Sequence, residues 1–459
     1  MSRLIVVSNR VSVSKLGQMA AQGGLAVAIL AGLKERGGIW FGWSGEKVET
    51  PSPEPHVVEQ GNLSFATVDL SPTDYDEYYA GFANRVLWPL FHYRLENANF
   101  QHRARLGYSR VNAFFADSLL PMLKEDDLIW VHDYHLIPLG QELRRRGVKN
   151  RIGFFQHIPW PPSELYVTLP DHREVLQELS HYDLVGFQTE WDVLAFEQYL
   201  RRETDAQLSD DGAVYLDGLY FRVGAFPISI DTDNVIAMAQ RAGAAAPARR
   251  LAGSLIGRRL VLGVDRLDYT KGLVERFEAF GLMLKEHPDL RGKVTFVQIA
   301  PPSRGDVPEY MEIRKALEAK AGEINGRYAD LDYVPIRYLN KGFARETIAG
   351  FLRVADVGFI TPLRDGMNLV AKEFVAAQDP KDPGVLVLSR FAGAAQEMTG
   401  GLLVNPHDIE GMAQSLARAL DISREERVFR WHPMFQHLVS YQVSDWFANF
   451  LNTLAAQRR

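Results

Sequence analysis

The stretch Leu-Val-Leu-Gly-Val-Asp-Arg-Leu-Asp-Tyr-Thr-Lys-Gly, residues 260–272, decides the fold of the second half of the chain. Its first five residues are apolar or glycine, which predicts a strand covered on both faces, followed by a polar loop and a helical pattern. The loop carries Arg266 and Lys271. Both cations suit phosphate oxygens, because Arg offers a planar fork and Lys a compact charge. The alternative interpretation is an exposed loop with ordinary surface cations.

The same alternation of short strands and helical patterns runs along the whole chain. Further apolar, β-branched or aromatic runs lie at 4–8, 128–132, 152–157, 184–188, 221–228, 294–300, 333–339, 357–361 and 385–389. The alternation predicts an α/β fold with two facing Rossmann-like, doubly wound domains. Such sheets bind ligands at the carboxyl ends of their strands, so we expect the active site in a cleft between the domains.

The length of 459 residues is enough for two domains. We expect an N-terminal acceptor domain over 1–235 and a C-terminal donor domain over 236–430. An Ala- and Gly-rich stretch, 242–257, precedes a new strand and supports a boundary in this region. The aromatic helical segment 431–459 is expected to pack back on the N-terminal domain.

Composition excludes several functional classes. A net charge of -6 gives no global basic field, so neither nucleic acid nor an anionic membrane is an expected partner. The absence of cysteine excludes disulfides, thiolate metal sites and a cysteine nucleophile. The first residues resemble a strand rather than a signal peptide, and the longest nearly apolar stretch, 23–33, is too short to span a bilayer. We therefore expect a cytoplasmic protein, and a homo-oligomer stays open.

A second polar loop follows the strand predicted at 357–361. It reads Asp-Gly-Met-Asn-Leu-Val-Ala-Lys-Glu, residues 365–373. Gly366 permits a tight turn, and a helix predicted to begin near Asn368 would offer its free N–H groups to an anion. Glu373, one turn further on, is placed to accept hydrogen bonds from a ribose diol. The alternative is a simple turn with an Asn cap, with Lys372 and Glu373 on a solvated face.

In the first half, polar side chains follow the strands predicted at 128–132 and 152–157. Asp133 and His157 are interpreted as residues that hydrogen-bond sugar hydroxyls. The spacing of His132 and His135 is compatible with metal ligands, but no H-E-x-x-H motif or carboxylate-rich companion accompanies it. A buried histidine satisfied by the backbone is the alternative for His135.

Other motifs are weaker. Two Asp-x-Asp strings occur at 231–233 and 330–332, and we expect neither to bind a metal, because the first precedes a helical pattern and suits a helix cap. The glycines Gly23 and Gly24 open a helix, but neither G-x-G-x-x-G nor a Walker A loop is present. Kinases and nicotinamide dehydrogenases are therefore disfavoured.

Several short motifs recur in one order and spacing along residues 1 to about 420. They are Asn9-Arg10, Gly23-Gly24-Leu25, Trp40-Phe-Gly-Trp43-Ser-Gly, Glu77-Tyr-Tyr79, Trp88-Pro, His132-Asp-Tyr-His-Leu, Gly153-Phe-Phe-Gln-His157-Ile-Pro, Arg266-Leu-Asp-Tyr-Thr-Lys271-Gly, Ser303-Arg304-Gly-Asp306 and the run 365–373. In these motifs the chain resembles the trehalose-6-phosphate synthases. The resemblance implies a glycosyltransferase-B fold, with the acceptor on the N-terminal half and the nucleotide-sugar on the C-terminal half.

The resemblance also implies roles for the residues of the donor site. Arg266 and Lys271 would neutralise the donor diphosphate, and the backbone at Leu369 and Val370 would contact the nucleotide. Phe343 would lie near the nucleobase and Glu373 at the ribose. The other implied donor-binding residues are Gly23, Gly24, Asp365, Gly366, Met367, Asn368, Ala371 and Lys372.

The implied acceptor is glucose-6-phosphate. It would be held by Arg10, Trp43, Tyr79, Trp88, Asp133 and Arg304, with the two arginines at its phosphate. The residues expected to act in the chemistry are His157, Asp133, Arg266 and Lys271. The family retains the anomeric configuration by front-face attack, with the diphosphate accepting the acceptor proton; no pair of carboxylates presents itself as nucleophile and acid. No cofactor and no metal is expected, and UDP-glucose is the default donor substrate.

Other functions remain as alternatives. Within the family, these are a synthase that glucosylates glycerol-3-phosphate and a pseudo-glycosyltransferase that joins cyclitols. Tyr79 and Trp88 favour a hexose acceptor over both. A sugar-nucleotide epimerase would not need the phosphate-binding Arg10 and Arg304. A catalytically silent regulatory relative should have lost the cations of the diphosphate loop, which are present here.

Overall fold

The computed structural model describes residues 2–11, 29–30, 32–33, 36–303 and 308–457. The chain divides into two compact units. Unit 1 comprises Met1–Ile228 and Val443–Arg459, and unit 2 comprises Ser229–Gln442. The chain thus leaves unit 1 at Ile228, before the boundary predicted at 235. The segment 431–459 is shared, because its first residues belong to unit 2 and only the part from Val443 belongs to unit 1.

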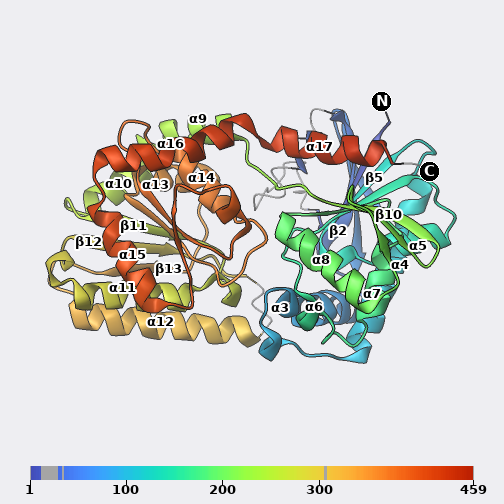
Figure 1. The fold of residues 1–459 in the computed structure, drawn as a ribbon, viewed down its shortest axis with the longest axis horizontal. Coiled ribbons are helices and arrows are strands. Elements are labelled where there is room, and N and C mark those ends of the chain that lie inside the picture. Colours follow the sequence, from blue (N-terminus) through green and yellow to red (C-terminus); the bar gives the residue numbers. More distant parts are fainter. Residues whose placement is uncertain (1, 12–28, 31, 34–35, 304–307, 458–459) are drawn as a thin grey trace. The chain divides into compact units, whose positions relative to one another are not determined.

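Unit 1 is built on a 10-stranded sheet of order β3-β4-β2-β1-β5-β6-β7-β10-β9-β8 (Figure 1). Its strands are β1 (Leu4–Arg10), β2 (Gly38–Lys47), β3 (His56–Gln60), β4 (Leu63–Leu70), β5 (Leu128–His132), β6 (Arg151–Phe155), β7 (Leu184–Phe187), β8 (Gln207–Leu208), β9 (Ala213–Leu216) and β10 (Leu219–Ala225). The strands from β4 to β10 are parallel, and the antiparallel pairs β3–β4, β10–β9 and β8–β9 lie at the two edges. The strand order reverses between β1 and β5, which makes this the topological switch point of the sheet.

The helices of unit 1 include a π-helix, η1 (Tyr75–Leu87), and a 3₁₀ turn, η4 (Tyr134–Leu136). The other helical segments are α2 (Pro72–Asp74), α3 (Trp88–Phe91), η2 (Leu95–Asn97), α4 (His102–Leu119), η3 (Leu120–Met122), α5 (Leu139–Arg145), α6 (Ser163–Tyr166), α7 (His172–Leu179), α8 (Glu190–Glu203) and α17 (Val443–Ala455). In the C-terminal helix α17, Phe450 stacks on Trp130 of β5 at 4.4 Å between ring centroids.

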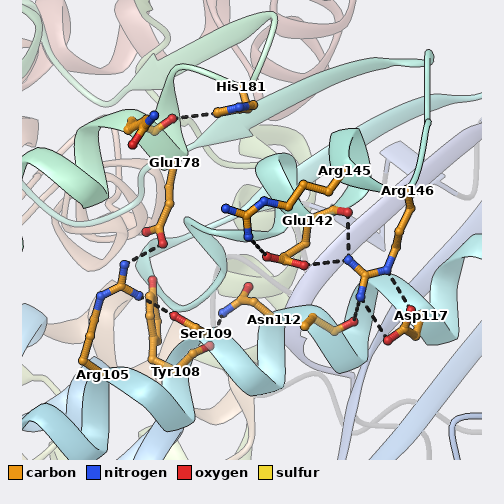
Figure 2. Close-up of polar contacts among 12 residues, drawn as sticks. Arg105, Tyr108, Ser109, Asn112, Asp117, Glu142, Arg145, Arg146, Glu178 and His181 are labelled. Atoms are coloured by element: carbon orange, nitrogen blue, oxygen red, sulfur yellow. Dashed lines mark hydrogen bonds and ion pairs between the residues drawn. The ribbon is translucent and has the colours of Figure 1, made fainter.

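Ion pairs join three helices of unit 1 (Figure 2). Arg105 on α4 donates to Glu178 on α7 at 2.6 Å. Arg146, just after α5, donates to Asp117 on α4 at 2.7 Å and to Glu142 at 2.6 Å. These contacts hold α4, α5 and α7 together.

Unit 2 is built on a 6-stranded, wholly parallel sheet of order β13-β12-β11-β14-β15-β16. The strands are β11 (Arg259–Val264), β12 (Val294–Ile299), β13 (Ile336–Leu339), β14 (Val357–Ile360), β15 (Val385–Ser389) and β16 (Leu402–Val404). This is the doubly wound Rossmann order, with its switch point between β11 and β14. The predicted α/β class with two Rossmann-like units is therefore confirmed.

Helices cover both faces of this second sheet (Figure 1). On one face lie α11 (Leu273–Glu286), α12 (Pro308–Tyr328) and α15 (Ile409–Asp421). On the other lie α9 (Thr232–Gly243), α10 (Ala246–Ser254), α13 (Arg345–Val354), α14 (Leu369–Ala377) and α16 (Arg424–Ser440). Burial on both faces explains why these strands are apolar throughout rather than alternating. In the described part of the chain, no helix is long and apolar enough to cross a membrane.

Candidate active site

The loop between β11 and α11 is rigidly built at the switch point of unit 2. Asp268 is buried and accepts hydrogen bonds from the backbone N–H of Thr270 at 3.0 Å and from its hydroxyl at 2.9 Å. Tyr310 on α12 donates to the other oxygen of Asp268 at 2.9 Å. Gly272 then adopts a left-handed φ of 63°, and a Cβ there would lie 2.3 Å from the carbonyl oxygen of Thr361. Only glycine fits at this point.

A buried arginine, Arg276, holds the same loop by hydrogen bonds to a side chain and to the backbone. Arg276 on α11 is fully buried and donates to Asp265 at 2.7 Å, to Gln298 at 2.9 Å and to the carbonyl oxygen of Lys271 at 3.2 Å. Burial raises the pKa of Asp265, and the neighbouring guanidinium opposes that effect. Arg276 therefore fixes the backbone that carries Lys271, although it does not itself face outward.

The loop after β14 meets this basic loop. Lys271 Nζ lies 2.5 Å from Asp365 Oδ2, and Asn368 donates to the same oxygen at 3.0 Å. Asn368 has a left-handed φ of 78°, which asparagine tolerates, and its side chain caps α14 by accepting from the N–H of Ala371 at 3.2 Å. The predicted helix start near Asn368 is confirmed.

These contacts leave an anion-binding arrangement at the switch point. Within the described residues, the N–H groups of Leu369 and Val370 in the first turn of α14 have no hydrogen-bond acceptor. Arg266 is exposed, whereas the side chain of Lys271 is largely buried. A cation pair beside a helix N-terminus can neutralise a diphosphate. Lys271 is therefore not an ordinary surface cation on an exposed loop, which was the alternative interpretation.

The other predicted donor residues differ in their surroundings. Glu373 is paired with Arg345 at 3.4 Å, and burial raises the pKa of its carboxyl group. Lys372 is fully buried and forms an ion pair with Glu397 at 2.5 Å, so the alternative that places Lys372 on a solvated face is wrong. Phe343 packs edge-on against Phe351 at 5.5 Å. Gly366 and Met367 are buried in the turn before Asn368.

In unit 1, aromatic rings gather at the carboxyl ends of β2 and β5. Trp43, which lies within β2 and pairs with Arg10 of β1, packs on Tyr79 of η1 at 5.7 Å, and Tyr79 stacks on His135 at 5.8 Å. The guanidinium of Arg10, at the end of β1, lies over the Trp43 ring at 5.7 Å. Trp88 packs on Tyr134 at 5.8 Å. A cation beside a wall of aromatic rings suits a sugar phosphate, because rings pack on sugar faces and the cation binds the phosphate.

Asp133 occupies the switch point of unit 1 in a strained conformation. Its φ is 77° directly after β5, and its carboxylate accepts from the backbone N–H of His157 at 3.2 Å. A non-glycine residue in this region costs about 1–3 kcal/mol, and such strain is often found at functional sites. The strand ends of β5 and β6 are thus tied together at the position where the sequence placed a sugar-binding carboxylate.

His157 lies over a second, buried histidine. Its Nε2 is 3.0 Å from Nδ1 of His132, and its Nδ1 is 3.4 Å from Nε2 of Gln188. Burial lowers the pKa of His157 to about 3. Burial, and then the adjacent His157, lower the pKa of His132 well below its ordinary value. Both rings are therefore neutral at physiological pH.

Three predicted residues lie outside the described part of the chain, and two structural residues were not predicted. Gly23, Gly24 and Arg304 lie outside the described residues. Sequence reasoning missed Arg276 and Gln188, whose partners are distant in sequence. Nothing in their local sequence marks them, since an arginine on a helix and a glutamine after a strand are both ordinary.

Neither candidate metal motif forms a metal site in the described residues. No group of three or more histidine or acidic side chains with metal-binding geometry is found there. Asp231 caps α9 by accepting from the N–H of Asn234 at 3.1 Å, as the sequence predicted. Asp332 pairs with Arg258 at 2.8 Å, and His135 stacks on Tyr79.

Comparison with known proteins agrees with this geometry. Residues 2–456 match the model of glycosyltransferase family 20. The trehalose-6-phosphate synthase of Sinorhizobium fredii is 51% identical over 458 residues, which cover 99% of each chain. The α,α-trehalose-phosphate synthase (UDP-forming) of Burkholderia xenovorans, solved in complex with glucose-6-phosphate, is 49% identical with a TM-score of 0.96, covering 99% of this chain and 100% of that one.

A further structure carries a donor analogue. The trehalose-6-phosphate protein of E. coli bound with UDP-2-fluoro glucose is 47% identical with a TM-score of 0.94, and 99% of each chain is covered. The family model covers nearly the whole chain, and these relatives share about half of their residues with it over their full length. The chain belongs to glycosyltransferase family 20.

Proposed function

We propose that the protein transfers glucose from UDP-glucose to glucose-6-phosphate, forming trehalose-6-phosphate and UDP. The observation that carries the proposal is the basic loop at the switch point of unit 2, where Lys271 is held on Asp365 beside the N-terminus of α14. A relative of 49% identity was crystallised with glucose-6-phosphate and one of 47% identity with a fluorinated UDP-glucose. These two relatives thus bind glucose-6-phosphate and a fluorinated UDP-glucose, respectively.

Unit 2 is proposed to bind the donor. Arg266 and Lys271 bind the diphosphate, with the N–H groups of Leu369 and Val370 adding further donors. Lys271 lies 2.5 Å from Asp365, and the donor diphosphate would be a second partner of the lysine. Because Asp365 is anchored by Asn368, it stays in place to orient the lysine rather than to leave the site.

Unit 1 is proposed to bind the acceptor. Arg10 and Arg304 bind its phosphate, and Asp133 accepts hydrogen bonds from the hexose hydroxyls. Trp43, Tyr79 and Trp88 pack on the ring. The aromatic contacts of Tyr79 on both sides, with Trp43 and His135, support this arrangement, because they fix the ring before the sugar arrives.

The transfer breaks the bond between the anomeric carbon and the diphosphate oxygen and forms a bond to the acceptor hydroxyl oxygen. The acceptor proton passes to the departing diphosphate, so the enzyme needs neither a metal nor a cofactor for the step. A solved trehalose-6-phosphate synthase that is 48% identical was studied for glycosyl transfer with retention. The chain's contribution is to position both substrates and to stabilise the charge that grows on the leaving group.

Product analysis tests the proposal. Purified protein is incubated with UDP-glucose and either glucose-6-phosphate or glycerol-3-phosphate, and UDP release and product mass are followed. A disaccharide monophosphate formed only with glucose-6-phosphate supports the proposal. Product only with glycerol-3-phosphate refutes the acceptor assignment, and binding of UDP-glucose without turnover refutes the transferase assignment. Replacing UDP-glucose by ADP- or GDP-glucose then ranks the donors.

A variant pair tests the diphosphate assignment. Lys271→Ala is expected to lower kcat by about 10²–10³, as loss of one charge-stabilising group does in other enzymes. Lys320→Ala is the matched control, because this lysine on α12 pairs with Glu278 and Glu323 on the surface of the same unit. Equal activity of the two variants contradicts the role of Lys271.

A further inference from the structure

Three polar side chains form a hydrogen-bonded chain beneath the strand ends of unit 1. Gln188 follows β7, His157 follows β6, and His132 is the last residue of β5. Gln188 Nε2 is 3.4 Å from His157 Nδ1, and His157 Nε2 is 3.0 Å from His132 Nδ1. Gln188 and His132 are buried and His157 is half-buried, so the two outer members of the chain are shielded from water.

The backbone fixes the orientation of the glutamine. The N–H of Ile228 donates to Gln188 Oε1 at 3.0 Å. A peptide N–H can only donate, so the amide oxygen must face it and the amide NH₂ must face His157. An NH₂ group can only donate, so His157 Nδ1 must be the acceptor and carry no proton.

The remaining protons follow from this assignment. A neutral His157 with an unprotonated Nδ1 carries its proton on Nε2, which donates to His132 Nδ1. His132 then carries its proton on Nε2, an atom that is buried without an acceptor among the described residues. If His157 carried its proton on Nδ1 instead of Nε2, the ring N–H would face the NH₂ of Gln188, and two donors would oppose each other. A charged His157 would meet the same conflict.

Other described residues also contact His157. The carboxylate of Asp133 accepts a hydrogen bond from the backbone N–H of His157. The rings of Phe155 and Trp446 pack around the imidazole at 4.6 and 6.2 Å. Burial lowers the pKa of His157 to about 3, in agreement with a neutral ring.

We infer that Gln188 is a positioning residue that holds His157 as the neutral tautomer protonated on Nε2, under the control of the Ile228 backbone. Ile228 is the last residue of unit 1 before the chain enters unit 2, so the connecting segment sets the tautomer. His157 Nε2 is thereby committed to His132 and does not exchange protons with a substrate. This deepens the proposed function, on which it rests, since it leaves the diphosphate as the proton acceptor.

Solid-state ¹⁵N NMR of histidine-labelled protein tests the inference directly. Ring nitrogens with and without a proton resonate far apart, and the His157→Asn variant identifies the His157 signals. In wild-type protein we expect a protonated Nε2 and an unprotonated Nδ1 for His157. The full-length protein is used without substrate, so the result does not depend on turnover.

Gln188→Glu provides the perturbation. The carboxylate still accepts from Ile228 but now also accepts from His157, so we expect the proton of His157 to move to Nδ1 and kcat to fall by about tenfold to a hundredfold. The matched control is Gln378→Glu in unit 2, because Gln378 is also buried and accepts from the N–H of Gly384. This control is expected to lose stability without changing the His157 signals.

Two results would overturn the inference. One is a wild-type His157 with its proton on Nδ1, or with protons on both nitrogens near neutral pH. The other is a Gln188→Glu variant with the wild-type pattern of His157 signals. If that variant does not fold, the wild-type spectrum alone decides. A protein that proves inactive on glucose-6-phosphate but shows the expected spectrum would refute the proposed function and leave the tautomer assignment intact.

Discussion

The buried ion pair between Arg276 and Asp265 offers the sharpest test of how unit 2 supports its basic loop. Arg276→Met removes a fully buried guanidinium and keeps most of the side-chain volume. It leaves the carboxylate of Asp265 buried without its cation, and it removes hydrogen bonds to Gln298 and to the carbonyl oxygen of Lys271. The loop should lose both its stability and its shape.

The size of the effect follows from burial. Breaking a buried pair by removing one partner costs about 3–5 kcal/mol, because the other charge stays desolvated. For a unit of this size, each kcal/mol lowers Tm by about 2–4 °C, so Arg276→Met should lower the Tm of unit 2 by roughly 6–20 °C. The control Arg314→Met breaks an exposed pair with Glu318 and should cost less than about 1 kcal/mol.

Calorimetric unfolding measures the effect, and hydrogen exchange in β11 and α11 assigns it to unit 2. Adding Asp265→Asn to Arg276→Met removes the stranded charge and should recover more than about 1 kcal/mol. Strict additivity of the two substitutions, or an Arg276→Met loss no larger than that of Arg314→Met, would refute the reasoning.

The same variant should show a characteristic pH dependence. Burial raises the pKa of Asp265 already in the wild-type protein, and loss of Arg276 should raise it further. A folded pKa above the unfolded value means that the native state binds more protons, so the stability falls as pH rises between the two values. The difference in free energy of unfolding between wild-type protein and Arg276→Met should therefore become smaller as the pH is lowered from 7 towards 4.

Two further predictions concern the same unit. Gly272→Ala should lower the free energy of unfolding by about 1–3 kcal/mol and distort the basic loop, because φ is 63° and the new Cβ would meet the carbonyl oxygen of Thr361. The control is Gly253→Ala, whose Cβ would have nothing within 4 Å; it should leave the free energy of unfolding unchanged or raise it by up to about 1 kcal/mol. Equal melting temperatures would contradict this. Lys372→Met should lower the free energy of unfolding by up to about 3–5 kcal/mol at pH 7, because it leaves the carboxylate of Glu397 with His437 in place of a fully charged lysine. Burial raises the pKa of Glu397, but His437 and Lys372 lower it below its ordinary value, so the stabilisation is lost as pH falls through that lowered pKa. An unchanged urea midpoint of Lys372→Met at pH 7 would exclude this role.

The sequence located five of the ten strands of the unit 1 sheet and five of the six strands of the unit 2 sheet; it missed β2, β3, β4, β8, β9 and β16. The predicted runs at 128–132 and 385–389 coincide with β5 and β15. β2 contains Gly38, Gly42 and Gly45, and glycine within a strand ordinarily weakens the assignment. Here the glycines are required by packing, because a Cβ on Gly42 would lie 2.2 Å from the carbonyl oxygen of Ser8 in β1. Only the neighbouring strand explains that composition.

The sequence also located the candidate site to within a loop, for a simple physical reason. Parallel strands bring their carboxyl ends to one edge, so polar residues that follow β11 and β14 must meet there whatever the details of packing. The contact between Lys271 and Asp365 is an instance. By contrast, the His132–His157 contact depends on ring orientation, which no local pattern encodes.

Lys271 and Lys372 show where the limit of such prediction lies. Lys271 lies just before α11 and Lys372 lies one turn into α14, and each has an acidic partner at 2.5 Å. Lys271 lies on a loop, where it contacts Asp365 just before the first turn of α14. Lys372 lies one turn into α14, fully buried against Glu397, where replacing that partner would require opening the helix packing. Both lysines are buried cations in similar motifs, and only the structure shows that one lies in the turn before α11 and the other inside α14. We therefore expect Lys372 to stabilise α14, whereas Lys271 keeps its place in the proposed donor site.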